Sequence, residues 1–102
     1  MYFVYILECS DHTFYTGITT NLDRRVKEHN TSKIGAKYTK VRRPVKLIYS
    51  QEFNNRSAAS IEESRIKKLS RTEKLNLIIV ETLHATSLQL TPTSLQNNKI
   101  TL

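Results

Sequence analysis

The stretch "FYTGITTNLDRRVKEH", residues 14–29, contains a strand-like run, a glycine and a helix in close succession. Its β-branched and aromatic residues predict a strand over residues 13–18, which includes Gly17, the first of only two glycines. Asn21 is a favourable N-cap, so we expect a helix over residues 22–29. One face of that helix, at spacing i, i+3, i+4 and i+7, carries Leu22, Arg25, Val26 and His29.

That helical face combines apolar and cationic side chains. Leu22 and Val26 must pack on a sheet, which puts Arg25 and His29 on or beside the buried side. A buried guanidinium is costly unless a protein carboxylate or a ligand phosphate pairs with it. In the alternative interpretation, the aliphatic part of the Arg25 side chain packs on the core while its guanidinium stays in water, and His29 is a hydrogen-bonded interface residue. We expect the remaining charged residues to form the solvated face: Arg24, Lys27 and Glu28.

The segments on either side of this stretch predict two more strands. The continuous apolar run over residues 2–7 is typical of a strand buried on both faces, at the centre of its sheet. Its short connection to residues 13–18 predicts an antiparallel hairpin. Residues 31–40 show little periodicity, so we expect a loop with room for one helical turn. Pro44 then precedes a third strand over residues 45–53.

Two further helices are expected in the second half of the chain. Asn55 or Ser57 caps a helix that ends near residue 69. Ser70 and Glu73 have capping-box spacing, so another helix begins there and continues to about residue 83. We expect this last helix to turn four apolar residues inward: Leu75, Ile78, Ile79 and Leu83.

These elements predict an α+β domain in the order ββαβαα, with a small three-stranded, mainly antiparallel sheet flanked by helices. The domain is expected to cover residues 1–83, which suits a chain of 102 residues. Residues 84–102 are polar and lack periodicity, so we expect a disordered C-terminal tail there.

The charge balance points to a polyanionic partner. Sixteen Lys and Arg against nine Asp and Glu give a formal charge of +7, and such a basic surface attracts nucleic acid. The single cysteine, Cys9, excludes an internal disulfide and fits a reducing compartment. We see neither a signal-peptide pattern nor a membrane-spanning segment, and therefore expect a cytoplasmic monomer that does not bind membranes.

Two other groups of residues are candidates for chemistry. The helix after Asn55 places Glu63 on its apolar stripe with Glu62 beside it, so one acid borders the core. That acid would either neutralise Arg25 or hold a hard divalent cation such as Mg2+. Tyr5 and Tyr15 come from paired strands and are either core residues or, near Arg25, proton acceptors from water.

In this order, the residues resemble the GIY-YIG nuclease domain. Its two signature elements would be Phe3-Val4-Tyr5 and Tyr15-Thr16-Gly17, where Phe3, Val4 and Thr16 depart from the pattern and the tyrosines and glycine remain. Small stand-alone bacterial members, the UPF0213-like subgroup, are the closer match. Three segments resemble this subgroup strongly, within about residues 1–80: "VYILECSDHTFYTGITTNLDRRVKEHN", "GAKYTKVRRPVKLIYSQEF" and "SRIKKLSRTEKLNLI".

This resemblance implies metal-dependent hydrolysis of phosphodiester bonds in DNA, with repair or recombination as candidate settings. Tyr5, helped by Tyr15, would orient or deprotonate the attacking water, and Arg25 would stabilise charge on the scissile phosphate. Glu63, chosen over Glu62, would hold one divalent ion, Mg2+ or Mn2+. The resemblance also implies that His29 either stands behind the reacting groups and positions them, or transfers a proton. It implies too that Gly17 lets the chain pass close to the site.

Nucleic-acid contacts are expected mainly in the loop before the third strand. Its basic residues and one tyrosine suit phosphate contacts and stacking on an unpaired base: Lys33, Lys37, Tyr38, Lys40, Arg42 and Arg43. A rival interpretation keeps the fold but makes the protein a non-catalytic nucleic-acid-binding module. A third makes it a structural or protein-interaction domain whose charge is incidental.

Overall fold

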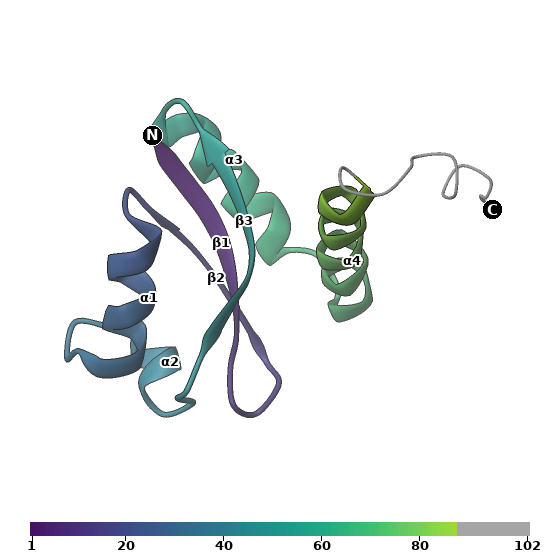
Figure 1. Cartoon of the computed structure of the whole chain (residues 1–102). Helices are drawn as coiled ribbons and strands as arrows, with labels where there is room; N and C mark the ends of the chain where they lie inside the picture. Colours follow the sequence, from purple (N-terminus) through teal and green to yellow (C-terminus); the bar gives the residue numbers. More distant parts are fainter. Residues whose placement is uncertain (88–102) are drawn as a thin grey trace. The chain divides into compact units, whose positions relative to one another are not determined.

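The computed structural model describes the fold of residues 1–87 and the side chains of residues 1–81. The chain forms two compact units, Met1–Leu69 and a second unit that begins at Ser70. The first unit holds all three strands and three helices, in the order β1, β2, α1, α2, β3, α3 (Figure 1). The prediction of an α+β fold in the order ββαβαα is confirmed, with α2 as one additional short turn.

The sheet has the strand order β2-β1-β3, and both pairs are antiparallel. The strands are β1 (Tyr2–Glu8), β2 (Phe14–Thr19) and β3 (Lys46–Phe53). The prediction that β1 is central and buried on both faces is confirmed, because four consecutive residues, Val4 to Leu7, are at most 1% exposed. Alternate residues of a strand point to opposite faces, so Tyr5 and Leu7 share one face of the sheet.

Helix α1 (Leu22–Thr31) covers the face of the sheet to which Tyr5 points. The Asn21 side chain accepts a hydrogen bond from the Arg24 backbone N–H, which confirms the predicted cap. Leu22 and Val26 pack against the cluster that contains Tyr5. The sequence pattern ended this helix at residue 29, two residues early.

The C-terminus of α1 is fixed to the following loop and to β3. The Asn30 side chain donates to the Val45 carbonyl and accepts from its N–H, at 3.0 and 2.7 Å. Gly35 lies where a Cβ would be 2.6 Å from the Glu28 carbonyl oxygen, so only glycine fits beside this helix end without a backbone shift. The loop contains the helical turn α2 (Lys37–Lys40), which brings residue 39 under α1.

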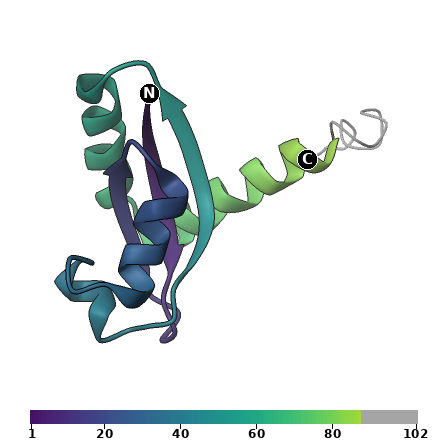
Figure 2. The same ribbon diagram turned by 60° about the vertical axis from the view of Figure 1, so that its left-hand side comes forward.

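Helix α3 (Arg56–Lys67) packs on the sheet from the other side, so the sheet lies between α1 and α3 (Figures 1 and 2). Its cap is Asn55 rather than Ser57, because the Asn55 side chain accepts from the Ala58 N–H at 2.8 Å. Ala59 and Ile66 are fully buried. The helix ends at Lys67, two residues before the expected boundary.

Helix α4 (Arg71–Ser87) belongs to the second unit. The predicted capping box is confirmed by reciprocal bonds between Ser70 and Glu73. Two residues expected to turn inward, Leu75 and Ile79, are instead 37% and 51% exposed. The reason is that apolar residues 77–80 are consecutive and surround the helix, so the helical period alone defines no single buried face.

The boundary expected after residue 83 falls inside α4, which continues to Ser87. The side chain of Leu83 and the remainder of the expected tail, residues 88–102, lie outside the described residues. Within residues 1–87, no helix combines the length and apolar character that crossing a membrane requires.

Candidate active site

Tyr5 lies directly across from Gly17 in the β1–β2 register, and Tyr15 is paired with the next inward residue, Leu7. Tyr5 and Tyr15 are therefore diagonal neighbours on one face, with ring centroids 6.4 Å apart. A Cβ at position 17 would lie 2.6 Å from the Tyr5 hydroxyl oxygen and 3.2 Å from the Tyr15 ring. Gly17 thus leaves the space that the Tyr5 phenol fills.

The Tyr5 hydroxyl begins a chain of buried hydrogen bonds. Its oxygen is 2.8 Å from His29 Nε2, and His29 Nδ1 is 2.8 Å from Thr39 Oγ1. Thr39 Oγ1 donates to the Ala36 carbonyl at 2.9 Å, so it accepts from His29 Nδ1–H. The His29 tautomer assigned by this network carries its proton on Nδ1, and Nε2 accepts the proton of the Tyr5 hydroxyl.

Burial sets the charge states of this pair. Burial, together with the nearby Tyr15, raises the pKa of Tyr5 to about 12, although Arg25 opposes the shift. Burial, together with the Arg25 charge, lowers the pKa of His29 to about 4. Both side chains are therefore neutral near pH 7, and the proton resides on Tyr5.

Arg25 is half-buried beside Tyr5, and its partner is Glu28 from its own helix. Arg25 Nη1 donates to Glu28 Oε1 at 3.0 Å and to the Ile34 carbonyl at 2.9 Å. Burial opposes its charge, but hydrogen bonds to Glu28 and Tyr5 raise the pKa of Arg25 overall. The expectation that Glu28 belongs to the solvated face is wrong, because this ion pair holds its side chain to 20% exposure.

The two neighbouring glutamates of α3 have different surroundings. Glu62 accepts hydrogen bonds from two guanidinium nitrogens of Arg65, Nε at 2.9 Å and Nη2 at 2.6 Å. Glu63 is paired with Lys67 Nζ at 3.1 Å, and its charge is among the influences that raise the pKa of Tyr5. Glu62 is not among these influences on Tyr5, so Glu63 is the one of the two whose charge acts toward the Tyr5 phenol.

A series of neighbouring aromatic rings connects this cluster to the basic loop before β3. Tyr15 is 5.0 Å from the His29 ring centroid and 6.2 Å from that of Tyr38, with which it stacks. The Arg42 guanidinium lies 3.8 Å over the Tyr38 ring and bonds to Asp11 at 3.1 Å. Two of the residues expected to contact nucleic acid, Tyr38 and Arg42, therefore form one preorganised surface.

The remaining loop cations separate into two groups. The side chains of Lys33, Lys37 and Lys40 are exposed and have no ion pair within the described residues. Arg43 differs, because its guanidinium donates to the carbonyls of His29, Glu28 and Ser32, at 2.6, 3.3 and 2.6 Å. These bonds close the C-terminal end of α1, so we reassign Arg43 from nucleic-acid contact to a structural role.

Sequence reasoning missed two members of the site. Thr39 is fully buried and orients His29, yet it lies ten residues away in a segment without periodicity. Glu28 neutralises Arg25, and its i, i+3 spacing from Arg25 was a usable signal.

A divalent cation is compatible with the donors at this site. No group of three or more His, Cys, Asp or Glu that could hold a metal gathers in the described part of the chain. Mg2+ needs no such group, because it keeps several waters and often takes one carboxylate plus phosphate oxygens. Glu63 would supply one carboxylate in place of its ion pair with Lys67, whose side chains are 54% (Lys67) and 23% (Glu63) exposed.

The class of protein follows from a comparison with known families. The model of the GIY-YIG catalytic domain matches residues 1–76, which include every strand and the cluster around Tyr5. The chain therefore belongs to the GIY-YIG family. Within it, the chain is similar to the UPF0213 protein of Syntrophus aciditrophicus, 57% identical over 76 residues, which covers 74% of this chain and 87% of that protein.

The chain is also similar to another relative and to two solved structures. A UPF0213 protein of Clostridium perfringens is 53% identical over 78 residues, covering 76% of this chain and 83% of its own. The solution structure of the Bacillus halodurans UPF0213 protein BH0048 is 44% identical, with a TM-score of 0.52 over 78% of this chain and 85% of that one. The solution structure of EF2693 from E. faecalis is 41% identical, with a TM-score of 0.54 over 82% and 86%.

Proposed function

We propose that this protein is a nuclease that hydrolyses phosphodiester bonds in DNA with one Mg2+ or Mn2+ ion. The observation that carries the proposal is that the Tyr5 phenol bonds to His29 at 2.8 Å and to Arg25, while the charge of Glu63 also raises the pKa of Tyr5. Family membership supports the reaction class, and the basic surface supports a nucleic-acid partner.

Tyr5 and His29 are proposed to remove the proton of the attacking water. The hydroxyl oxygen of Tyr5 takes that proton while its own proton moves to His29 Nε2, 2.8 Å away. Direct deprotonation of Tyr5 to solvent is unfavourable, because its pKa is raised to about 12. A bound phosphate would offset the Arg25 charge that depresses the pKa of His29, and would thereby make His29 a stronger base.

Arg25 is proposed to bind the scissile phosphate. Its guanidinium is oriented by Glu28 and the Ile34 carbonyl, so it needs little rearrangement as negative charge develops. Glu63 would hold the divalent ion, which polarises the phosphate and assists the leaving oxygen when bound. Tyr15 packs against both Tyr5 and His29 and keeps their rings in place.

The test is cleavage of a panel of duplex, single-stranded, flapped and branched DNA in Mg2+. We expect Arg25→Ala and Glu63→Gln each to lower the cleavage rate by about 100-fold or more. Glu62→Gln is the matched control, because it removes the same charge one residue away, at a carboxylate bound to Arg65, and should retain cleavage.

Binding is measured separately in EDTA to distinguish the enzyme from its main rival. Wild type that binds DNA tightly but cleaves nothing in the panel would favour the non-catalytic binding module. Equal losses in Glu62→Gln and Glu63→Gln would contradict the assignment of the metal to Glu63.

A further inference from the structure

A second basic surface lies beside the candidate active site, away from the loop that the sequence pointed to. It is a shallow depression of about 370 Å3 where the start of β1, the end of β2 and the starts of α1 and α3 meet. We call it the arginine groove. Its lining includes three arginines, one carboxylate, an aromatic ring and an exposed hydroxyl: Arg24, Arg25, Arg56, Glu28, Tyr2 and Thr20.

The cations of this groove outnumber its carboxylates three to one. Glu28 is its single carboxylate and is engaged by Arg25 at 3.0 Å, while Arg24 approaches the same carboxylate only to 3.7 Å and is 60% exposed. Arg56 has neither an ion pair nor a side-chain hydrogen bond with any residue that the structure describes. As the first residue of α3, Arg56 also lies at the positive end of the helix dipole.

Arg25 belongs to both surfaces. It lines the arginine groove, acts on Tyr5, and donates to the Ile34 carbonyl in the basic loop. A strand whose scissile phosphate sits at Arg25 therefore lies next to both the groove and the start of the loop. Guanidinium groups bind phosphate through paired N–H donors, so the groove suits the phosphodiesters of the same strand.

We propose that the arginine groove binds the nucleic-acid backbone next to the scissile phosphate, with Arg24 and Arg56 as its phosphate ligands. This inference rests on the proposed function for the position of the scissile phosphate. The half-buried Tyr2 ring lies at the same depression and suits stacking on an adjacent base. The strand then extends across Arg25 from the loop lysines to the groove.

The test measures binding of a fluorescein-labelled single-stranded oligonucleotide by anisotropy, in EDTA, over a range of KCl concentrations. We expect the double variant Arg24→Gln/Arg56→Gln to weaken binding about 10-fold and to lower the slope of log K against log salt by about 1.4. The matched control, Lys27→Gln/Lys46→Gln, loses the same charge from exposed positions outside the groove and should change each quantity much less.

Arg24→Lys/Arg56→Lys keeps the charge and should restore most of the salt slope, which excludes misfolding as the cause. Equal losses in the glutamine variant and its control, or no binding by wild type, would overturn the groove proposal. So would displacement of the oligonucleotide by millimolar inorganic phosphate at constant ionic strength, because the groove would then be a site for free phosphate. Wild type that binds through the groove but never cleaves would refute the nuclease proposal and leave the groove intact.

Discussion

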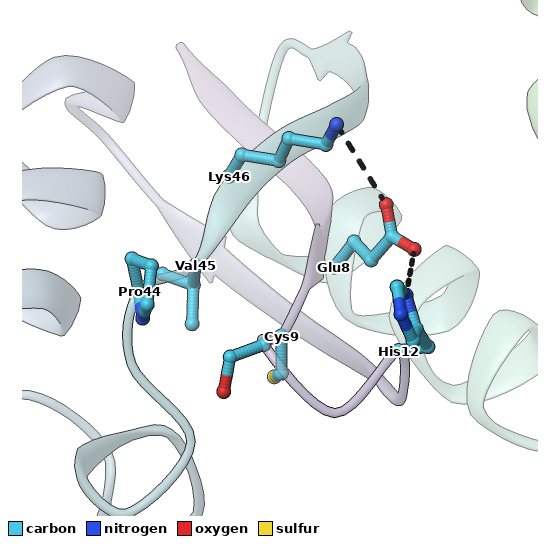
Figure 3. A pocket seen from close by; sticks show the side chains of 7 residues that line it. Glu8, Cys9, His12, Pro44, Val45 and Lys46 are labelled. Atoms are coloured by element: carbon cyan, nitrogen blue, oxygen red, sulfur yellow. Dashed lines mark hydrogen bonds and ion pairs between the residues drawn. The ribbon is translucent and has the colours of Figure 1, made fainter.

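Two histidines of the described residues, His12 and His29, have very different surroundings. His12 contacts a carboxylate, and His29 contacts a phenol. His12 lies in the β1–β2 turn, where its Nδ1 is 3.2 Å from a Glu8 oxygen and Lys46 lies 4.0 Å from the other oxygen (Figure 3). The His12 side chain is 80% exposed. His29 is fully buried between Tyr5 and Thr39.

The difference shows that residue types alone do not make a reactive centre. An exposed pair such as His12–Glu8 is screened by water and contributes about 0–1 kcal/mol. At His29, each ring nitrogen has one fixed partner, so the tautomer and the direction of proton transfer are set by the fold. Both histidines lie near carboxylates, and burial is what separates them.

The largest effect is expected when each histidine is removed in turn. His29→Gln deletes the acceptor of the Tyr5 proton, and we expect cleavage to fall about 100- to 10,000-fold. His12→Gln removes a histidine of the turn, and single-turnover cleavage by this variant should match wild type. Comparable losses in both variants would break the distinction between the two regions.

A smaller effect is expected in stability against pH. The pKa of His29 is about 4 in the folded protein, below its ordinary value near 6.5. As pH falls from 6.5 toward 4, the unfolded chain binds a proton that the folded chain does not, so the free energy of unfolding decreases. The loss between pH 7 and 5 should be about 2 kcal/mol.

Urea unfolding at both pH values measures this loss, because the buried histidine contributes to it and most carboxylates stay ionised. His29→Gln should remove about that part of the pH dependence, while His12→Gln should keep it. Parallel curves for wild type and His29→Gln would mean that burial does not hold His29 neutral.

The smallest effect is expected at Thr39, which acts through His29 and is a positioning residue. Thr39→Val keeps the shape but removes the acceptor of His29 Nδ1–H, so the tautomer is no longer fixed. We expect cleavage to fall about 10-fold and its pH profile to shift. Thr39→Ser retains the hydroxyl and should restore both, whereas a purely structural role would leave the pH profile unchanged in Thr39→Val.

Much of this arrangement could be predicted from local patterns. The i, i+4 spacing of Arg25 and His29 with Leu22 correctly placed His29 under α1, since a helix has only one face against the sheet. The apolar run of β1 correctly predicted a central strand. Strand pairing made Tyr5 and Tyr15 candidates, and the family resemblance gave their roles and that of Gly17.

The rest depends on contacts that no local pattern encodes. Thr39 meets His29 only because the loop folds back around Gly35 under α1. Arg43 looked like a phosphate ligand in a basic run, but three carbonyls at the end of α1 bind its guanidinium. The arginine groove combines residues from three separate parts of the sequence, between positions 2 and 56, so composition could indicate its charge but not its place.

The central claim is that His29 is a neutral base that accepts a hydrogen bond from Tyr5, and nitrogen NMR of the histidine rings tests it most directly. Between pH 8 and 5, we predict that His29 carries its proton on Nδ1 and has a bare, hydrogen-bonded Nε2, with no titration until the pH approaches about 4. Assignment by His29→Gln identifies its signals. A ring protonated on Nε2, or one that titrates above pH 6, would contradict the proposed proton path from water through Tyr5.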